Sequence, residues 1–387
     1  MIRNTSEEDL PVKLSIIVLA YNIKHMVSQC LLSLNHQVRI QDDMFEVVFV
    51  DDGSDDGTQE AVANLKIDYK LKYVYRAADS KKCRSTARNL GASEASGDLL
   101  LFLDGDQVVE QDFIYQHLKV HQLCSETLVV VGLRDFLSVD SPIQLSNGEE
   151  IDRSSLILER RDPRLPIFER FSENAGNIEN IWALLYSCNF SLSKKIYFEV
   201  GGFDEDFIEW GLEDCELGYR LYQQGAKFVV NTKCIVLHQY HPSIYDAKKY
   251  LGWFINLELF KKKHPSLEVE LQGILADWFD PERRKPWKDA FIRFELAVRA
   301  VKGIYNNLNT LYKLVVVTDG NDTEDLLLRI TNALKSHNVL VIDFSDSDLD
   351  LLIQLVPRSF DLLYYRQPSQ ERIIEVFKSV ATNISEL

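Results

Sequence analysis

The chain has 387 residues, a formal net charge of −16 and 46% apolar residues. This length allows one large domain plus a smaller one, and the composition is ordinary for a globular protein. The negative charge argues against nucleic acid and anionic membranes as partners, because both are bound by basic surfaces.

Export and membrane insertion are not expected. The first ten residues are polar and acidic and lack the apolar centre of a signal peptide. No run of 18 apolar residues occurs, so no transmembrane segment is predicted. The six cysteines are scattered without a CxxC pair, which disfavours both a zinc site and a disulfide framework. We therefore expect a cytoplasmic protein with reduced thiols.

Apolar runs alternate with helical patterns through the first hundred residues. Strands are predicted at residues 14–20, 45–50, 71–75 and 99–103, and helices at residues 25–34, 58–65 and 85–95. This alternation predicts an α/β fold with a doubly wound sheet. In such sheets, ligands bind beyond the carboxyl ends of the strands.

Three of these predicted strands end in short segments that carry polar residues. The segments are Ala20, Tyr21 and Asn22 at the end of the first, Asp51 and Asp52 at the end of the second, and Asp104, Gly105 and Asp106 at the end of the fourth. A carboxylate at a strand end can accept a hydrogen bond from a base or a ribose, although Asp51 and Asp52 can also simply form a turn. Two carboxylates one residue apart can hold a hard cation such as Mn²⁺ or Mg²⁺. Because these segments share one edge of the sheet, they predict a nucleotide-binding and metal-binding site.

The pattern is irregular from about Asp135 to Asn180, which predicts an insertion over the site. A helix at 214–224 and strands at 228–230 and 234–237 follow. Residues 245–309 are helical in pattern, and strands at 314–317, 339–344 and 362–365 then alternate with helices at 325–336 and 349–356. We therefore predict a catalytic domain over residues 1–244, a helical extension over 245–311 and a small α/β accessory unit over 312–387.

Two later motifs carry further polar residues. Trp210 opens a short segment that ends in Glu213 and Asp214 at the start of a helix, where the helix dipole alone would favour acids. One of these carboxylates could instead take a proton from an acceptor hydroxyl. His238 and His241 follow the last strand of the predicted catalytic domain, three residues apart.

Taken together, these motifs resemble the family 2 glycosyltransferases of the GT-A fold over about residues 13–242. The likeness is to the subset that transfers Gal, GalNAc or GlcNAc, which includes chondroitin polymerases and polypeptide GalNAc transferases. The resemblance implies a Rossmann-like GT-A domain, a UDP-sugar donor carrying a hexose or N-acetylhexosamine, and Mn²⁺ or Mg²⁺. Two departures from the family pattern, Gln107 after the second acid and the insertion over residues 135–180, leave the donor sugar open.

The resemblance also implies a role for each matching residue. Donor-binding residues are Ala20, Tyr21, Asn22, Asp51, Asp52, Arg88, Asp104, Gly105 and Trp210. Metal ligands are Asp104 and Asp106 with one or both of His238 and His241. The expected base is Asp214, with Glu213 positioning the acceptor or the sugar, and Arg88 is preferred to Arg84 as a nucleotide contact.

We expect inversion at the anomeric carbon, while retention stays open because retaining enzymes carry a similar Trp-Gly-Gly-Glu segment. The acceptor is not readable from the sequence. The alternative is a non-catalytic nucleotide-sugar-binding scaffold whose C-terminal unit binds a partner. A nucleotidyltransferase is a third reading, but its Gly-rich loop after the first strand is missing. The C-terminal unit is expected to be an accessory element that packs on the helical segment around Trp278 and Trp287 or mediates self-association as a homo-oligomer. The alternative is a simple stabilising extension.

Overall fold

The computed structural model describes residues 13–35, 37–41, 44–77, 83–123, 127–145, 151–172, 174–242, 247–278, 285–307, 312–317 and 338–343. The chain divides into two compact units, Met1–Lys263 and His264–Leu387. They are described separately below. This division does not test the predicted boundaries at residues 244 and 311, which stay predictions.

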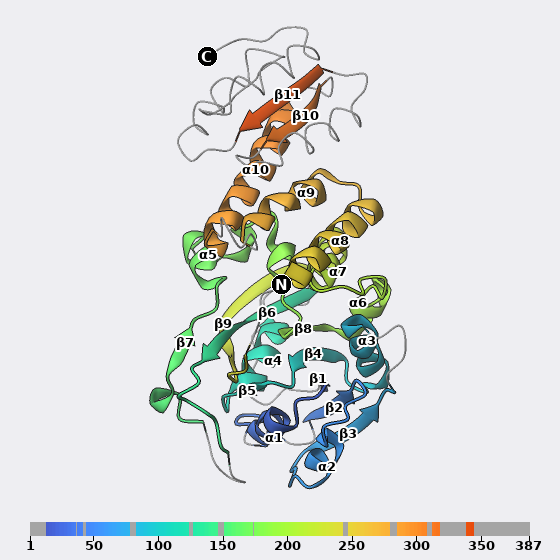
Figure 1. Ribbon diagram of the computed structural model, residues 1–387, viewed down its shortest axis with the longest axis vertical. Helices are drawn as coiled ribbons and strands as arrows, with labels where there is room; N and C mark the ends of the chain where they lie inside the picture. Colours follow the sequence, from blue (N-terminus) through green and yellow to red (C-terminus); the bar gives the residue numbers. More distant parts are fainter. Residues whose placement is uncertain are drawn as a thin grey trace. The chain divides into compact units, whose positions relative to one another are not determined.

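The strands of the first unit form one mixed sheet (Figure 1). They are β1 Leu14–Ala20, β2 Phe45–Asp51, β3 Lys70–Tyr75, β4 Leu99–Asp104, β5 Gln107–Val109, β6 Leu128–Leu137, β7 Leu158–Arg160, β8 Asn189–Ser193 and β9 Lys227–His238. The helices of this unit are α1 Lys24–Ser33, α2 Thr58–Ala63, α3 Arg84–Glu94, α4 Phe113–Leu123, α5 Leu165–Arg170, α6 Lys194–Glu199, α7 Glu213–Gln223 and α8 Ala247–Lys263.

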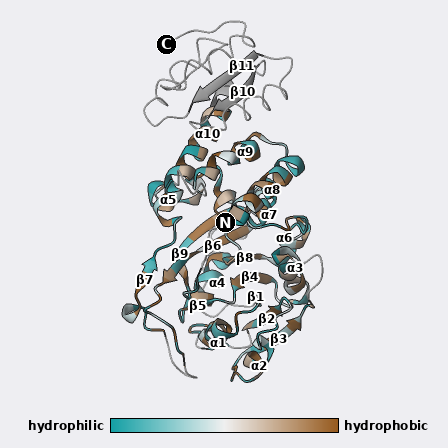
Figure 2. Cartoon of the chain, viewed as in Figure 1, coloured by the Kyte–Doolittle hydropathy of each residue, from teal (hydrophilic) through white to brown (hydrophobic). Residues whose placement is uncertain are grey.

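The first four strands are parallel and lie in the order β3-β2-β1-β4. Strands β1, β2 and β4 are apolar except for the buried Ser15 and Glu46 and the acids that end β2 and β4. They are buried on both faces, as parallel strands between helical layers require. Figure 2 shows the same segregation, with apolar residues on the central strands and polar residues on the helix surfaces. The α/β class and the four predicted strands are therefore confirmed.

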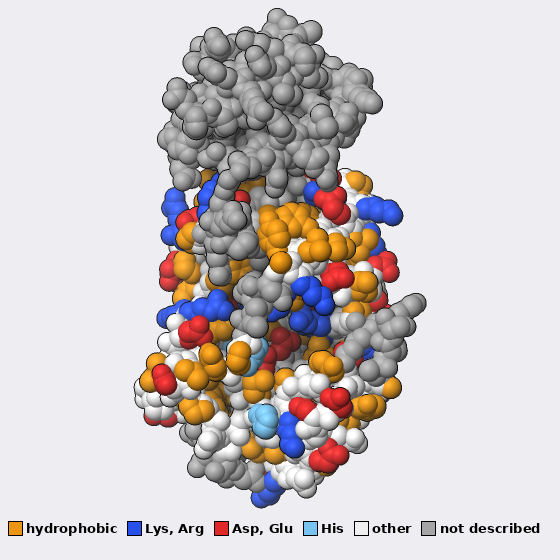
Figure 3. Space-filling view, in the orientation of Figure 1, with side chains coloured by type: hydrophobic (Ala, Val, Ile, Leu, Met, Phe, Trp, Pro, Cys, Tyr) orange, Lys and Arg blue, Asp and Glu red, His pale blue; other side chains and the backbone are white. Residues whose placement is uncertain are grey.

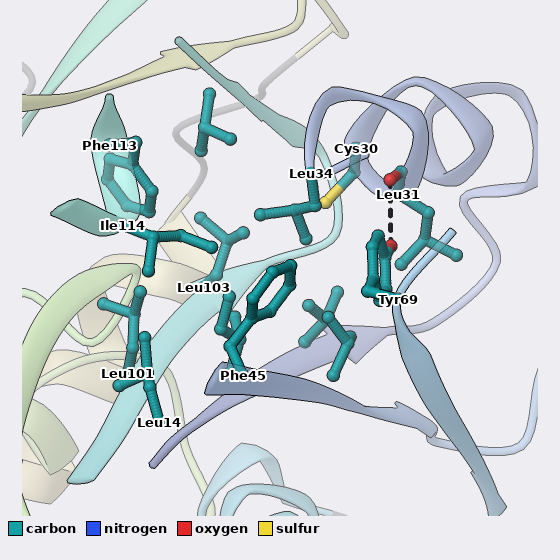
Figure 4. Close-up of a cluster of buried hydrophobic side chains, with 14 of the residues drawn as sticks. Leu14, Cys30, Leu31, Leu34, Phe45, Tyr69, Leu101, Leu103, Phe113 and Ile114 are labelled. Atoms are coloured by element: carbon teal, nitrogen blue, oxygen red, sulfur yellow. Dashed lines mark hydrogen bonds between the residues drawn. The ribbon is translucent and has the colours of Figure 1, made fainter. Parts of the chain in front are cut away.

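Helices α1 and α4 cover one face of this half of the sheet. Their apolar side chains join alternate residues of β1, β2 and β4 in one buried cluster (Figure 4). Within it, the Tyr69 hydroxyl donates to the Leu31 carbonyl at 2.9 Å, so the polar end of this buried ring has a partner. Helix α3 lies on the other face, where a Cβ on Gly91 would come within 2.4 Å of Ile17. Glycine thus allows α3 to approach the sheet closely.

Beyond β4 the sheet is mixed. Strand β8 is antiparallel to β4 and to β6, β9 is parallel to β6, and β5 is antiparallel to β9. The two short strands predicted at 228–230 and 234–237 are one strand, β9. The polar residues between them remain in it because the register shifts opposite Val131 and Leu133 of β6.

The predicted irregular stretch over residues 135–180 is partly regular. Its first residues belong to β6, where the buried Asp135 carboxylate forms an ion pair with Arg153 at 2.5 Å. Strand β7 then pairs with β6, and α5 and short 3₁₀ helices at Arg153–Ser155, Ala175–Asn177 and Ile181–Leu184 follow. The polarity that suggested a loop comes from side chains that pair with one another on and beside the sheet.

The second unit is described in part. It contains α9 Leu267–Glu270, a 3₁₀ helix at Leu271–Trp278, α10 Trp287–Asn307, β10 Tyr312–Val317 and β11 Asn338–Asp343. Strands β10 and β11 are parallel, which confirms two of the three predicted C-terminal strands. The predicted helices at 325–336 and 349–356 and the strand at 362–365 lie outside the described residues. No helix among the described residues is long and apolar enough to span a membrane.

A buried polar chain ties α4 to β8. Asn189 uses its amide nitrogen to donate to two backbone carbonyls, so its oxygen is left to accept from His117 Nε2 at 3.0 Å. His117 Nδ1 therefore accepts from the Ser191 hydroxyl at 2.9 Å, and that hydroxyl accepts from His121 Nε2 at 2.9 Å. Both imidazoles are neutral in this chain, and burial lowers the pKa of His117 to about 3 and that of His121 to about 4.

This arrangement predicts acid sensitivity. Unfolded histidine titrates near pH 6.5, so below that pH the unfolded chain binds more protons than the folded one. The stability is therefore complete above about pH 6.5 and is lost as the pH falls toward 4, by up to about 1.4 kcal/mol per pH unit for each histidine. Urea unfolding at pH 7.5 and 5.0 should show a smaller pH dependence for His117→Gln/His121→Gln than for the wild type. The exposed His25→Gln should match the wild type, and an unchanged slope in the double variant would contradict this assignment.

Candidate active site

The loops after β1 and β2 are joined by hydrogen bonds. Asn22 has a left-handed backbone (φ 52°), and its amide donates to the Ser54 hydroxyl at 2.9 Å while its side-chain oxygen accepts from the Asp55 amide at 3.0 Å. Ala20 is buried at the end of β1, and the neighbouring Tyr21 is 52% exposed. The predicted donor-binding segment 20–22 is thus held in place by the acidic loop, and the Tyr21 ring is accessible to a ligand.

The two acids of that loop are already engaged within the protein. Asp51 is fully buried, and its oxygens accept from the Ser54 amide at 2.8 Å and from the Tyr73 hydroxyl at 2.5 Å. Asp52 accepts from Arg76 Nε at 2.6 Å. Asp51 therefore shapes the turn that a nucleotide would approach.

The turn between β4 and β5 needs its glycine. The Gly105 amide donates to the Leu19 carbonyl at 2.9 Å, and a Cβ at this position would lie 2.9 Å from the same carbonyl oxygen. This close approach fixes the turn against the end of β1. The acids on either side of Gly105 find different partners, described next.

Arg88 connects Asp104 to the later acid pair. Its guanidinium is buried and lies 3.5 Å from Asp104 Oδ1 and 3.2 Å from Glu213 Oε1. Burial disfavours the charged form, but the negative charges of Asp104, Glu213 and Asp214 together raise the pKa of Arg88. Residues of α3 and β4 thus meet a residue of α7, more than 100 positions later in the chain, at one charge.

Asp106 lies between the two predicted histidines. Its Oδ2 is 3.4 Å from Nε2 of His238 and 3.4 Å from Nε2 of His241. Strand pairing creates this cluster, because Gln107 of β5 is opposite His238 of β9. Burial alone would raise the pKa of Asp106, but the two histidines hold it well below its usual range, and Asp106 in turn raises the pKa of His241.

These three side chains fit a divalent cation. One ligand atom from each side chain lies within 4.8 Å of the other two. Among the described residues, no other three acids, histidines or cysteines are grouped in this way. Asp106 Oδ1 is buried and has no hydrogen-bond partner among the described residues. A carboxylate oxygen beside two imidazole nitrogens suits a transition-metal ion, and Asp104 is not part of the group.

Glu213 and Asp214 begin α7 after a strained turn. Gly211 (φ 90°) and Leu212 (φ 70°) both have left-handed backbones. Asp214 accepts from the Cys215 amide at 2.9 Å and from the Ser187 amide at 3.3 Å. Burial and then the charge of Glu213 raise the pKa of Asp214 to about 6. Glu213 Oε2 is buried without a hydrogen-bond partner among the described residues.

Helix α8 supports the turn that carries Trp210. Asn256 donates to the Gly211 carbonyl at 2.6 Å, and a Cβ on Gly211 would lie 3.0 Å from the Trp253 ring. Trp210 itself is partly buried. In the space-filling view, acidic side chains lie inside a hollow with basic side chains beside it (Figure 3). The predicted acids and histidines thus form two connected groups, one around Asp106 and one around Arg88.

Sequence reasoning missed residues of β6 and of the segment before β8. The Phe136 ring lies 5.0 Å from that of His238, and Arg134 precedes it by two positions on the same strand. Tyr186 precedes Ser187, whose amide binds Asp214. Had β6 been predicted as a strand, the alternation of side chains along it would have placed Arg134 and Phe136 on the same face.

The sequence was compared with known proteins. Residues 15–267 match the family described as "Glycosyltransferase like family 2". Validoxylamine A glucosyltransferase from Streptomyces hygroscopicus subsp. limoneus is 31% identical over 266 residues, covering 67% of this chain and 58% of that protein. The uncharacterized glycosyltransferase YfnE of Bacillus subtilis (strain 168) is 29% identical, with coverage of 60% and 66%. Chondroitin synthase of Escherichia coli is 26% identical, with coverage of 84% and 49%.

The chain therefore belongs to the family 2-like glycosyltransferases. The family predicted from the motifs is confirmed, and with it the glycosyltransferase class. The predicted α/β class is confirmed by the mixed sheet and its covering helices. The matched region spans about half to two thirds of the length of these relatives. Among solved structures, "Crystal structure of GalNAc-T7 with UDP, GalNAc and Mn2+" aligns with a TM-score of 0.47 and 17% identity, covering 75% of this chain and 57% of that one.

Proposed function

We propose that this protein transfers a hexose or N-acetylhexosamine from a UDP-sugar to an acceptor hydroxyl, with inversion and with a divalent cation. The observation that carries the proposal is the position of Arg88 between Asp104 and Glu213. This contact joins the turn after β4 to the acid pair of α7, so donor-side and acceptor-side groups share one site. The family membership supports the same chemistry.

The acceptor would be activated by Asp214. A carboxylate with a pKa near 6 is ionised at neutral pH and is a stronger base than an ordinary aspartate. As the acceptor oxygen bonds to the anomeric carbon, its proton passes to Asp214, and the bond from that carbon to the diphosphate breaks with its electron pair on the diphosphate. One displacement of this kind inverts the anomeric centre.

The remaining groups bind and orient. Glu213 Oε2, buried and without a partner among the described residues, would accept from a sugar hydroxyl, while Oε1 stays on Arg88. Tyr21 would offer an aromatic face to the base. Asp106, His238 and His241 would hold Mn²⁺ or Mg²⁺, which when bound neutralises charge on the diphosphate. The relative named for transferring glucose fits a hexose donor.

A second part of the proposal concerns the C-terminal segment. Parallel strands β10 and β11 require a crossover connection, which fits the predicted βαβ unit over residues 312–387. We propose that this unit is an accessory element that the transfer chemistry does not use. The division at residues 244 and 311 is part of the same proposal.

Donor hydrolysis tests the proposed function directly. Purified full-length protein with Mn²⁺ should release UDP slowly from one or more of UDP-glucose, UDP-galactose, UDP-GlcNAc and UDP-GalNAc, even without an acceptor. GDP-mannose serves as the control for nucleotide choice. A protein that binds UDP-sugars but never turns them over, with any acceptor mixture, would match the scaffold alternative instead.

A further inference from the structure

Arg134 lies on the same side of the sheet as the metal-fitting cluster. It is opposite Val236 in the β6–β9 pairing, and Phe136 is opposite His238. Residues two apart on a strand share a face. Because the Phe136 ring contacts the His238 ring, Arg134 faces the site as well.

Two aromatic rings lie beside the guanidinium of Arg134. Its central carbon lies 4.8 Å from the Phe136 ring centre and 5.7 Å from that of Tyr186. Burial lowers the pKa of Arg134, but negative groups that include Asp162 and Asp104 raise it overall. Tyr186 also adjoins Ser187, whose amide binds the proposed base. Arg134 is thus placed between the two groups of the site.

Arg134, which is partly buried, differs from the two buried arginines around the site. Arg88 is committed to Asp104 and Glu213. Arg164 is fully buried and donates to Asp162 and to two backbone carbonyls at 2.6–3.0 Å. In contrast, Arg134 Nε is buried and has no hydrogen-bond partner among the described residues.

We propose that Arg134 is a substrate-binding residue that recognises an oxyanion of the donor. A buried N–H donor without a partner is unfavourable, so this position favours a bound hydrogen-bond acceptor. The planar guanidinium fork matches phosphate and carboxylate oxygens in pairs. The neighbouring carboxylates would repel such an anion. Arg88 is already paired with Asp104 and Glu213, so Arg134 would supply the positive charge that attracts the anion.

This inference rests on the proposed function, because it assumes a nucleotide-sugar donor. Two donor groups carry the required oxyanion: the diphosphate, and a carboxylate on the transferred sugar when that sugar is a uronate. Both would present paired oxygens to the guanidinium. The experiment below separates them.

Binding can be measured by calorimetry with the full-length protein and Mn²⁺, using uridine, UDP, UDP-glucose and UDP-glucuronate. If the diphosphate is recognised, Arg134→Gln should weaken UDP binding at least tenfold and leave uridine binding unchanged. If the sugar carboxylate is recognised, Arg134→Gln should bind UDP-glucuronate more weakly than the wild type does, while its affinity for UDP-glucose is unchanged. Arg134→Lys keeps the charge but loses the planar fork, so its affinity should lie between those of the wild type and Arg134→Gln.

Arg160→Gln is the matched control. The Arg160 guanidinium lies 3.7 Å from the same Phe136 ring, but its side chain is exposed. Arg160→Gln removes the same charge beside the same ring. Equal losses of affinity in Arg134→Gln and Arg160→Gln would therefore mean that only the overall positive charge matters, and would overturn the proposal. Equal affinities of wild type, Arg134→Gln and Arg134→Lys for all four ligands would overturn it too. A wild type that binds neither UDP nor a UDP-sugar would instead reject the proposed function, and this inference with it.

Discussion

Asp214→Asn should reduce sugar transfer by about 10²–10⁴-fold while leaving the affinity for UDP within about twofold, because loss of a general base affects the transition state and not the donor. The amide cannot take the acceptor proton. Its carbonyl oxygen can still accept from the Cys215 amide, which Asp214 Oδ1 binds at 2.9 Å, while the longer hydrogen bond from the Ser187 amide to Oδ2 at 3.3 Å is lost. Steady-state kinetics and calorimetric UDP binding on the same preparation give the two numbers.

The pH dependence supplies an independent check on Asp214. With its pKa at about 6, the wild-type kcat/KM should fall about tenfold per pH unit below that value. The raised pKa of Asp214 also determines how its ionisation affects the free energy of unfolding. An acid whose pKa is raised by folding prefers the protonated form, so ionised Asp214 costs stability, and the cost develops as the pH rises from about 4 to 6. Asp214→Asn should therefore have a Tm at pH 8 equal to or above that of the wild type.

Asp206→Asn is the control for this variant, since its side chain is 71% exposed and lies outside the two groups of the site. It should retain full activity. Loss of UDP binding in Asp214→Asn, in parallel with the loss of transfer, would place Asp214 in the donor pocket and remove it as the base.

Asp106→Ala should abolish measurable Mn²⁺ binding and reduce donor hydrolysis by roughly 10²-fold or more, since a bound cation can supply several kcal/mol of charge stabilisation. The variant should fold, because it removes a carboxylate whose own Oδ1 has no partner among the described residues. Mn²⁺ affinity can be measured by electron paramagnetic resonance, independently of activity. EDTA should likewise remove activity from the wild type, and added Mn²⁺ or Mg²⁺ should restore it.

His238→Ala and His241→Ala should each weaken Mn²⁺ binding, because both Nε2 atoms are 3.4 Å from Asp106. Asp98→Asn is the matched control, an exposed carboxylate just before the opposite end of β4. Undiminished transfer in excess chelator, or wild-type Mn²⁺ affinity in Asp106→Ala, would refute this metal site.

Local patterns were sufficient to predict the N-terminal half of the sheet. Strands β1, β2 and β4 are mostly apolar and each ends at a polar turn, so neighbouring residues alone indicate both the strand and the loop after it. Strand β5 has three residues and follows a turn directly, which is too short a segment to carry a period. The polar residues within β9 likewise concealed a single long strand.

The sequence alone determined the glycosyltransferase class, the α/β fold and the residue types of the site, because family motifs are local strings placed at strand and helix ends. Only the tertiary structure decided how these residues are grouped. Pairing of β5 with β9 brings Asp106 to both histidines, and the buried charge of Arg88 draws Asp104 toward Glu213 instead. The buried Nε of Arg134, which has no hydrogen-bond partner among the described residues, could not be predicted from the sequence either. The partners of an arginine depend on strands and loops that are distant in sequence and adjacent in space.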